Sequence, residues 1–303
     1  MSEIINNRSE ILFFYDIENA NPNGDPLNEN RPRFDVENST VLVSDVRLKR
    51  TIRDYWYEYS GFNGTDGKDV FVRETKYKEG DKEYIKDGKR RAKDFDEQVK
   101  NILQTCIDIR IFGGVIPLQN DSITFTGPTQ FQMGRSLNKT EIIEEQGTGA
   151  FASGDKKSQS TFRIEYKVHY AIIGFNGIIN EKAAQYSEMT EDDKALLLEG
   201  IWNGTKNLIT RSKFGQTPLL LMTINYKEPF YIGGLRQRVK LDTGDINELQ
   251  IRSLEDFKID VSNLIDVLKA NNEKIESIDF KADSRLKLVY KDETIEKISK
   301  NEL

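Results

Sequence analysis

The chain has 303 residues, of which 37% are hydrophobic and 31% are charged, and its formal net charge is −6. This composition is typical of a folded globular protein and excludes an intrinsically disordered one. A single cysteine, Cys106, excludes an intramolecular disulfide framework, and the short apolar runs predict no membrane partner. The first residues lack the basic start and apolar stretch of a signal peptide, so we expect a cytoplasmic protein.

The net negative charge argues mildly against a nucleic-acid partner, but it is unevenly placed. Residues 241–303 contain 15 Asp and Glu and 10 Lys and Arg, so this segment carries −5 of the total of −6. Local basic clusters matter more for a binding groove than the total charge does.

The first elements are a buried strand and an amphipathic helix. Residues 11–15 form a continuous apolar run typical of a central strand, and a loop rich in turn formers follows. Residues 44–59 predict a helix, with Ser44 as its N-cap and Asp45 near the positive end of the dipole. One side of this helix is apolar and predicts a core face, formed by Leu48, Ile52, Tyr55, Trp56 and Tyr59.

The next segment changes character. Residues 61–93 are rich in glycine and charge and predict a solvated insertion with a hairpin. A second helix is predicted from Asp94 to residue 107, because Asp94 and Glu97 resemble a capping box. A short strand over 109–111 and a half-exposed strand over 123–133 follow, and alternation places Met133 on the buried side with Phe131.

The remaining elements complete a two-helix pattern. The polar residues 134–161 predict a long loop or a flexible hairpin, and residues 168–179 predict a central strand. A third helix begins at Thr190 and runs toward Arg211, and another central strand begins at Leu219. Beyond residue 240 the acidic sequence predicts a helix and a strand that pack on this core.

The core order is therefore strand, helix, strand, strand, helix, strand, within an α+β fold. This order is the ferredoxin-like pattern that RNA-recognition domains share. We expect one core over residues 1–240, with large insertions at 60–93 and 134–163, and an acidic elaboration over 241–303.

Several motifs together resemble the CRISPR-associated "Cas seven" family, and the likeness is greatest to the backbone subunit of type I, subtype I-B, Cascade complexes. The resemblance spans roughly residues 9–226. Its motifs are Asn21-Pro22-Asn23-Gly24-Asp25, residues 44–53, Ile109-Arg110-Ile111-Phe112-Gly113-Gly114, Thr126-Gly127-Pro128, Gly134-Arg135-Ser136-Leu137-Asn138-Lys139, Gly147-Thr148-Gly149-Ala150-Phe151 and residues 202–213.

The resemblance implies a modified RNA-recognition-like palm with a finger insertion at 60–93 and a thumb insertion at 134–163. It implies that copies of the chain assemble head to tail along one CRISPR guide RNA in an antiviral complex, together with other Cascade subunits. The guide would then pair with target DNA, and a separate helicase-nuclease would cut. No cofactor, metal or catalytic residue is implied for this chain.

The helix over 44–59 carries the first candidate RNA contacts. Lys49, Arg50 and Arg53 fall together on one side, one turn deep, and are predicted to neutralise phosphates without reading sequence. In isolation such a triple would be read as a solvated helix face.

Other candidate contacts come from the family motifs. Arg135, Asn138 and Lys139 would contact ribose and phosphate or form an ordinary turn, and Met133 would wedge beside a base or pack in the core. Phe151 would stack on a base or dock on a neighbouring copy from the thumb, or would lie in a disordered loop. The resemblance also implicates the end of the third helix, with Lys206, Arg211 and Lys213, although cations there also satisfy the helix dipole.

Two alternative functions stay open on the residues alone. Asp16, Glu18 and Asp25 keep open a metal-dependent ribonuclease that cleaves target RNA, as in related type III backbones. A general single-strand RNA-binding protein is the second alternative. The single histidine, His169, lies in an apolar strand and predicts a core residue rather than a zinc ligand.

Overall fold

The computed structural model describes residues 2–117, 122–152 and 160–302. Its centre is an antiparallel sheet with the strand order β17-β14-β1-β13-β11-β5-β4, in which β10 and β12 also pair with β13. The strands are β1 (Ser9–Ala20), β4 (Phe34–Asp35), β5 (Thr40–Val43), β10 (Thr129–Phe131), β11 (Gly134–Ser136), β12 (Ile142–Ala152), β13 (Ser160–Ile179), β14 (Gln216–Tyr226) and β17 (Ile275–Ala282).

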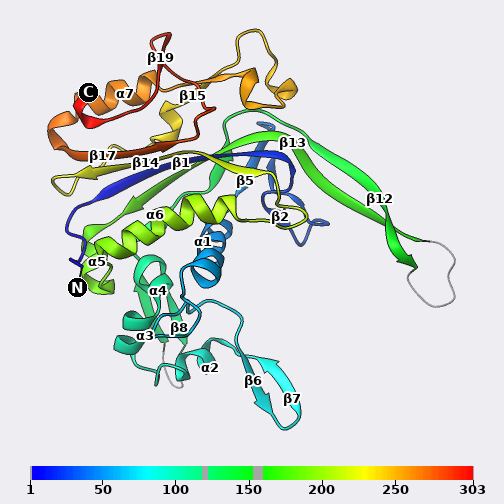
Figure 1. The fold of residues 1–303 in the computed structure, drawn as a ribbon, viewed down its shortest axis with the longest axis vertical. Coiled ribbons are helices and arrows are strands. Elements are labelled where there is room, and N and C mark those ends of the chain that lie inside the picture. The colour runs from blue at the N-terminus through cyan, green and yellow to red at the C-terminus, as the bar shows by residue number, and fades with distance from the viewer. Residues whose placement is uncertain (1, 118–121, 153–159, 303) are drawn as a thin grey trace.

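The predicted ferredoxin-like palm is confirmed. Chain order gives β1, α1 (Asp45–Tyr59), β10 and β11, β13, α6 (Glu191–Lys206) and β14, and the sheet order is β14-β1-β13-β11. Both helices lie against one face of the sheet, below it in Figure 1. A shorter helix, α5 (Glu181–Ser187), links β13 to α6.

The two long helices begin at caps that the sequence predicts. The Ser44 side chain accepts a hydrogen bond from Arg47 N, and Thr190 forms a reciprocal capping box with Asp193. On α1, Ile52 and Trp56 are fully buried, and the Trp56 indole N–H donates to Leu196 O. Tyr59 departs from the prediction, since it is 62% exposed at the last turn of α1.

The other face of the sheet is covered by the C-terminal part of the chain. Along β1, Ile11 and Phe13 face the helices, whereas Leu12 and Phe14 pack into a second core with residues from 235 to 298. The elements of this layer, at the top of Figure 1, are β15 (Lys240–Asp242), β16 (Lys258–Asp260), α7 (Ser262–Ala270), β18 (Leu288–Tyr290) and β19 (Glu293–Ile295), with short 3-10 turns η1 (Arg236–Arg238), η2 (Glu248–Gln250), η3 (Leu254–Asp256), η4 (Asn272–Lys274) and η5 (Lys300–Glu302).

This layer has a consequence for binding. RNA-recognition domains stack bases on the sheet face opposite their helices. Here that face carries a hydrophobic core, so a nucleic acid has no access to most of it. Contacts must come from the edges and ends of the sheet.

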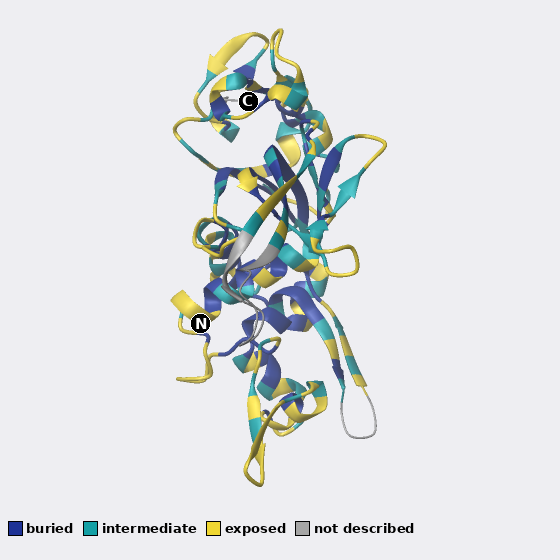
Figure 2. Ribbon diagram, turned by 90° about the vertical axis from the view of Figure 1, so that its right-hand side faces the viewer, coloured by how far each residue is buried: buried dark blue, intermediate teal, exposed yellow. Residues whose placement is uncertain are grey.

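A separate lobe, here called the finger lobe, comprises residues 64–117 and 122–126 and lies below the helices in Figure 1. It contains the β6–β7 hairpin and a small core that includes Phe71, Phe95 and Ile102. Figure 2 shows exposed residues concentrated on this hairpin. The elements are β6 (Lys76–Glu79), β7 (Lys82–Ile85), α2 (Gly88–Lys93), α3 (Val99–Thr105), α4 (Ile107–Phe112), β8 (Gly113–Pro117) and β9 (Ser122–Thr126).

Three predictions for this region are wrong. The helix does not start at Asp94, which is the C-cap of α2, because Asp96 and Glu97 have positive φ angles of 56° and 54°. Residues 109–111 are helical in α4 rather than extended. The strand over 123–133 is divided, since β9 pairs with β8 in the finger lobe while β10 joins the central sheet.

Glycine explains where that strand divides. A Cβ on Gly127 would lie 2.0 Å from Phe112 C and 2.2 Å from Gly113 N. The two motifs that contain Gly113 and Gly127 therefore have their backbones in close contact at the end of the β8–β9 ladder, where Gly113 pairs with Thr126, and this contact joins the finger lobe to the palm.

The predicted thumb is a long hairpin of β12 and β13 that projects from the sheet, to the right in Figure 1. Its ladder runs from the Ile142–Val168 pair to the Thr148–Phe162 pair. Of the two alternatives for residues 134–161, the described residues 142–152 and 160–161 have the paired strands of a hairpin, whereas residues 134–136 form β11 of the central sheet. A two-stranded ribbon, β2 (Gly24–Asp25) and β3 (Arg31–Pro32), lies in the loop after β1. Within the described residues, no helix is both long and apolar enough to cross a bilayer.

We predict that Gly127→Ala destabilises the protein by about 3 kcal/mol, because the added methyl group meets backbone atoms that cannot move independently. Gly147→Ala is the matched control, since its Cβ would meet only Arg163 Nη2 at 3.7 Å. Urea unfolding of both variants measures the difference. Equal free energies of unfolding in the two variants would contradict the close contact between the Gly113 and Gly127 backbones.

Candidate nucleic-acid interface

The three predicted cations of α1 each have an acidic partner. Lys49 is 9% exposed, and its Nζ lies 3.1 Å from Asp45 Oδ2. Arg53 Nε donates to Asp108 Oδ2 at 2.8 Å, and the Asp108 side chain is fully buried.

These three cations do not form a continuous cationic surface that is available to a ligand. Lys49 and Arg53 lie over the same Phe112 ring, at 5.6 and 5.2 Å from its centroid, whereas Arg50 is exposed and pairs with Asp54 at 2.7 Å. The helical spacing predicts neither Asp108 nor Phe112 as partners, because both come from a distant element. RNA contact by these three residues stays a prediction, and two of them support the fold.

A different cation of α1, Arg47, forms no salt bridge with any carboxylate in the described residues, and the charge of Asp54 acts on it only from a longer distance. Arg47 is half-buried, its Nη2 donates to Thr51 Oγ1 at 2.9 Å, and its buried Nε has no hydrogen-bond acceptor in the described structure. Lys213 lies near it and donates from Nζ to the backbone oxygen of Asn21 at 2.7 Å.

The electrostatics of this pair suit the binding of an anion. Burial lowers the pKa of Lys213 to about 8, and the positive charge of Arg47 contributes to the shift. Burial also lowers the pKa of Arg47. Two half-buried cations that repel one another cost free energy until an anion lies between them or beside them.

The loop after β1 places this pair. Asn23 Oδ1 accepts hydrogen bonds from Ser44 N and Ser44 Oγ, at 2.8 and 2.9 Å, so the loop is fastened to the first turn of α1. Asn21 N donates to Ser212 O, which fastens the same loop to the segment that carries Lys213. The Asn21-Pro22-Asn23-Gly24-Asp25 motif thus joins the two cationic segments.

The site contains further unsatisfied groups. Asn21 is 2% exposed, and its Oδ1 is buried without a hydrogen-bond partner among the described residues. The Gln216 Nε2 atom, at the start of β14, is also buried without a hydrogen-bond partner among the described residues. We call Arg47, Lys213 and Asn21 the α1-end site.

The second predicted group lies on β11 and after it. Arg135 pairs with Asp35 and donates to Thr40 Oγ1 at 3.0 Å, and Lys139 is exposed. Asn138 is fully buried, where its Oδ1 accepts from Ile172 N and its Nδ2 donates to Tyr170 O. In this structure the Asn138 amide joins strands and is closed to an external ligand.

Met133 departs from the alternation that placed it in the core. It is 53% exposed, because residues 132 and 133 lie between β10 and β11 rather than within one regular strand. The wedge interpretation therefore stays a prediction with a free side chain to support it.

Sequence reasoning missed two arginines beside this group. Arg236 and Arg238, in η1, have no acidic partner among the described residues, and burial lowers the pKa of Arg236, with a contribution from Arg135. The signal in the sequence was a basic run directly after the glycine pair Gly233-Gly234.

These arginines lie on the sheet face opposite the helices. A Cβ on Gly174 would meet both Phe14, which belongs to the C-terminal core, and the Arg236 side chain. The predicted contacts are thus divided between two faces of the sheet.

The third predicted group lies near the base of the thumb. Arg211 is exposed and its Nε donates to Glu165 Oε1 of β13 at 2.7 Å, and Lys206 is also exposed. Lys213 belongs to the α1-end site. The backbone of Phe151 is in β12, but its side chain lies outside the described part of the structure, so its role stays a prediction.

The carboxylates proposed for a ribonuclease do not form a metal-binding group. No three His, Cys, Asp or Glu side chains in residues 2–117, 122–152 and 160–302 are arranged to hold a metal ion. Asp16 accepts from the Tyr170 hydroxyl at 2.9 Å, and burial raises its pKa to about 6. Asp25 instead lies beside Arg33, at 3.4 Å.

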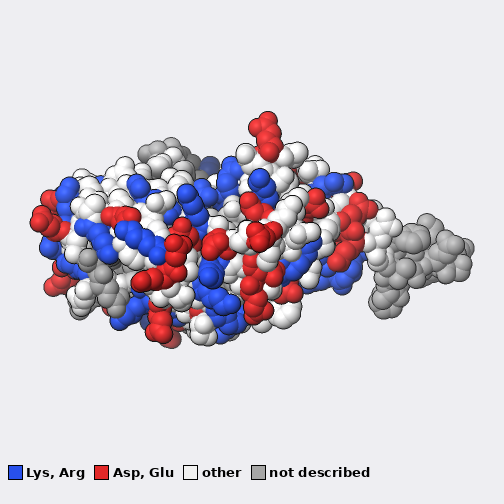
Figure 3. All heavy atoms as spheres, turned by 90° about the horizontal axis from the view of Figure 1, so that it is seen from above, with Lys and Arg blue, Asp and Glu red and all other residues white. Residues whose placement is uncertain are grey.

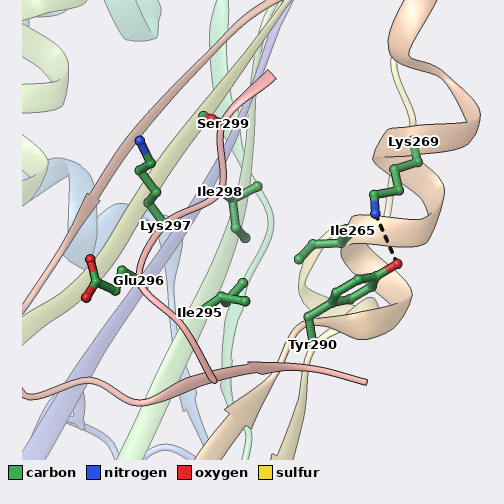
Figure 4. Close-up of a pocket in the computed structure, with 8 residues that line it drawn as sticks. All are labelled: Ile265, Lys269, Tyr290, Ile295, Glu296, Lys297, Ile298 and Ser299. Atoms are coloured by element: carbon green, nitrogen blue, oxygen red, sulfur yellow. Dashed lines mark hydrogen bonds between the residues drawn. The ribbon is translucent and has the colours of Figure 1, made fainter. Parts of the chain in front are cut away.

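The surface carries mixed charge, and two cavities lie away from the α1-end site. Figure 3 shows acidic and basic side chains interspersed over the face seen from above, with no broad field of one sign. A cavity of about 350 Å³ lies in the C-terminal layer, where Ile265 of α7 faces Ile295 and Ile298 and Lys269 donates to the Tyr290 hydroxyl (Figure 4). A second cavity, of about 440 Å³, lies between β10, β13 and the Tyr231–Gly234 loop.

Comparison with known proteins identifies the family of this chain. The family model for CRISPR-associated protein Cas7 matches residues 7–262. A CRISPR-associated protein Cas7 of Haloferax volcanii is 32% identical over 317 aligned residues, which cover 95% of this chain and 91% of that protein. The chain belongs to the Cas7 family.

Solved structures share the Cas7 fold seen here. A chain of a CRISPR RNA-guided surveillance complex has a TM-score of 0.53 and 11% identity, and the match covers 94% of this chain and 95% of that one. A chain of a CRISPR RNA-guided surveillance complex in a pre-nicking state has a TM-score of 0.52 and 12% identity, with coverages of 88% and 90%. At these identities the likeness is one of fold.

We predict that Arg53→Ala destabilises this Cas7 protein by about 3 kcal/mol, because it leaves the buried Asp108 carboxylate without its cation. Arg50→Ala removes an exposed pair on the same helix and is expected to cost about 0.5 kcal/mol or less. Thermal or urea unfolding compares them. Similar small losses in both variants would show that the Arg53–Asp108 pair is not structural.

Proposed function

We propose that this Cas7 chain is a non-catalytic, guide-RNA-binding backbone subunit of a type I Cascade antiviral complex, of subtype I-B. Copies of the chain would assemble along one CRISPR RNA with other Cascade subunits and present the guide for pairing with target DNA. Family membership over residues 7–262 supports the RNA-guided role, and the neighbouring folds come from RNA-guided surveillance complexes.

The observation that carries the proposal is the α1-end site. Arg47 and Lys213 are half-buried cations that form no salt bridge within the part of the chain that the structure describes, and the first turn of α1 adds backbone N–H groups of positive character. A phosphate of an RNA backbone supplies the anion that this pair lacks. Contact with phosphate carries no sequence information, which is what a guide of variable sequence requires.

Removal of the pair tests this assignment. We predict that the double variant Arg47→Ala, Lys213→Ala binds single-stranded RNA with a smaller salt dependence, because the slope falls by about 0.7 for each phosphate that the protein no longer neutralises. Lys291→Ala is the control, because Lys291 is an exposed cation of the C-terminal layer that pairs with Asp266 at 3.3 Å and belongs to none of the candidate contacts. Fluorescence anisotropy over a range of salt concentrations gives both slopes. An unchanged slope in the double variant would remove the α1-end site from the interface.

The lowered pKa of Lys213 makes a separate prediction. Phosphate binding needs the ammonium form, so RNA affinity should fall as the pH rises through about 8, where free Lys213 loses its proton. Lys213→Arg keeps its charge and should bind with less dependence on pH. Titrations from about pH 7 to about pH 9.5 compare the proteins. Parallel pH profiles would show that Lys213 does not hold a phosphate.

The stability of the free protein depends on pH in the opposite direction to its RNA affinity. The folded-state pKa of Lys213 lies below that of the unfolded chain, so above about pH 8 the unfolded state binds more protons. The contribution of Lys213 to the stability of the free protein therefore increases with pH over this window.

The non-catalytic part of the proposal has its own test. The assembled complex, incubated with complementary RNA and Mg²⁺, is expected to leave the RNA intact. Regularly spaced cleavage that disappears in Asp16→Ala would favour the metal-dependent ribonuclease instead. Sequencing of RNA that co-purifies with the chain separates a guide-RNA subunit from a general RNA-binding protein, since only the former yields repeat-spacer transcripts.

A further inference from the structure

The cavity of about 440 Å³ beside β10 is not used by the α1-end site. It lies between β10, the end of β13 and the loop that runs from Tyr231 to Gly234. Its size is within the range of small-ligand pockets, which is about 300 to 1,000 Å³.

The charged groups that line the cavity already have partners within the protein. Arg8 forms a bidentate pair with Glu181, at 2.9 and 3.1 Å. Glu10 accepts hydrogen bonds from the Tyr226 hydroxyl and from the backbone N–H groups of Ile232 and Gly233. A ligand of this cavity is therefore neutral rather than anionic.

The loop that forms the outer wall is held in place. Gly233 and Gly234 have φ angles of 74° and 62°, a region that favours glycine, and the Glu10 carboxylate fixes the loop through two N–H groups. This fixed loop presents Tyr231, whose side chain is 53% exposed. The Arg8 guanidinium lies 5.9 Å from the centroid of this ring, and the exposed part of the ring is a stacking surface on a fixed wall.

Unused hydrogen-bonding groups lie beside that ring. Asn176 Nδ2 donates to Gln132 Oε1 at 3.0 Å, which orients the Gln132 amide. Within the described residues, neither Gln132 Nε2 nor the Tyr231 hydroxyl has a hydrogen-bond partner. Amide and hydroxyl groups of this kind recognise the polar edge of a flat ligand.

The cavity also adjoins cations suited to a phosphate chain. Asn176 Oδ1 accepts from Arg236 N at 2.8 Å, so the cavity wall continues into the segment with Arg236 and Arg238, which lack acidic partners among the described residues. A neutral stacking pocket next to unpaired arginines matches a nucleotide unit, with its base in the pocket and its phosphate outside.

We propose that this cavity binds one unpaired nucleobase of a single-stranded RNA, stacked on Tyr231 and hydrogen-bonded to Gln132. The inference rests on the proposed RNA-binding function, but it concerns the sheet face opposite the α1-end site.

The test uses the full-length chain and a single-stranded RNA that carries 4-thiouridine. Tyr231→Ala is expected to weaken RNA binding about 5- to 150-fold, the range for loss of one base stack, and Tyr231→Phe to bind within about threefold of the unmodified chain because it keeps the ring. Tyr186→Ala is the matched control, since Tyr186 is 81% exposed and does not line this cavity. Irradiation is expected to cross-link the RNA to the peptide that contains Tyr231.

The outcomes separate this inference from the proposed function. If Tyr231→Ala binds RNA as tightly as the unmodified chain and no cross-link maps to its peptide, the base pocket is overturned while RNA binding stands. If the unmodified chain binds no RNA, the proposed function fails and this inference fails with it. Should Tyr231→Ala unfold, Gln132→Ala at an exposed position replaces it, and undiminished binding there together with cross-links elsewhere overturns the pocket.

Discussion

Burial of both faces of the central sheet is the constraint on which the rest of this structure depends. The helices α1 and α6 cover one face, and the C-terminal layer covers the other, so strands such as β1 alternate between two hydrophobic cores. In an ordinary RNA-recognition domain one face stays open for bases. In this Cas7 chain the polar contacts must lie where strands end and helices begin.

The positions of the charged side chains agree with the burial of both sheet faces. Most cations of the palm and finger lobe are paired with carboxylates, as in the Arg110–Asp193 and Arg91–Asp69 pairs, and these pairs hold elements together. Four half-buried cations differ from these paired ones. The half-buried pairs Arg47 with Lys213, and Arg236 with Arg238, form no salt bridge in the described structure. The first pair lies at the start of α1, and the second lies in a turn on the sheet face opposite the helices. An acidic protein can bind RNA when a few half-buried cations without salt bridges are placed in this way.

The sequence predicted those parts of the fold that follow from local periodicity. The helix over 44–59, its Ser44 cap, the central strands near residues 11–15 and 168–179, and the helix after Thr190 are all present, because hydrophobic spacing and capping are local signals. The finger lobe was mispredicted because Asp96 and Glu97 adopt positive φ and because the backbones of Gly113 and Gly127 approach closely at the end of the β8–β9 ladder. Neither fact can be read from periodicity. The α1-end site lies on the helix that carries the predicted contacts, but it uses Arg47, a residue that the helical spacing does not single out. Arg53 is paired by Asp108 from 55 positions away, whereas Arg47 is left unpaired, and only tertiary contacts distinguish them.

Hydrogen–deuterium exchange of the full chain, with and without guide RNA, tests the central claim most directly. The account predicts that RNA slows amide exchange in residues 44–47 and 210–216, which hold Arg47 and Lys213, and leaves the covered sheet and the helix α7 unchanged. Protection over β14, β17 and the C-terminal layer, with none at the start of α1, would contradict it, because RNA would then lie on the face that the structure shows as closed.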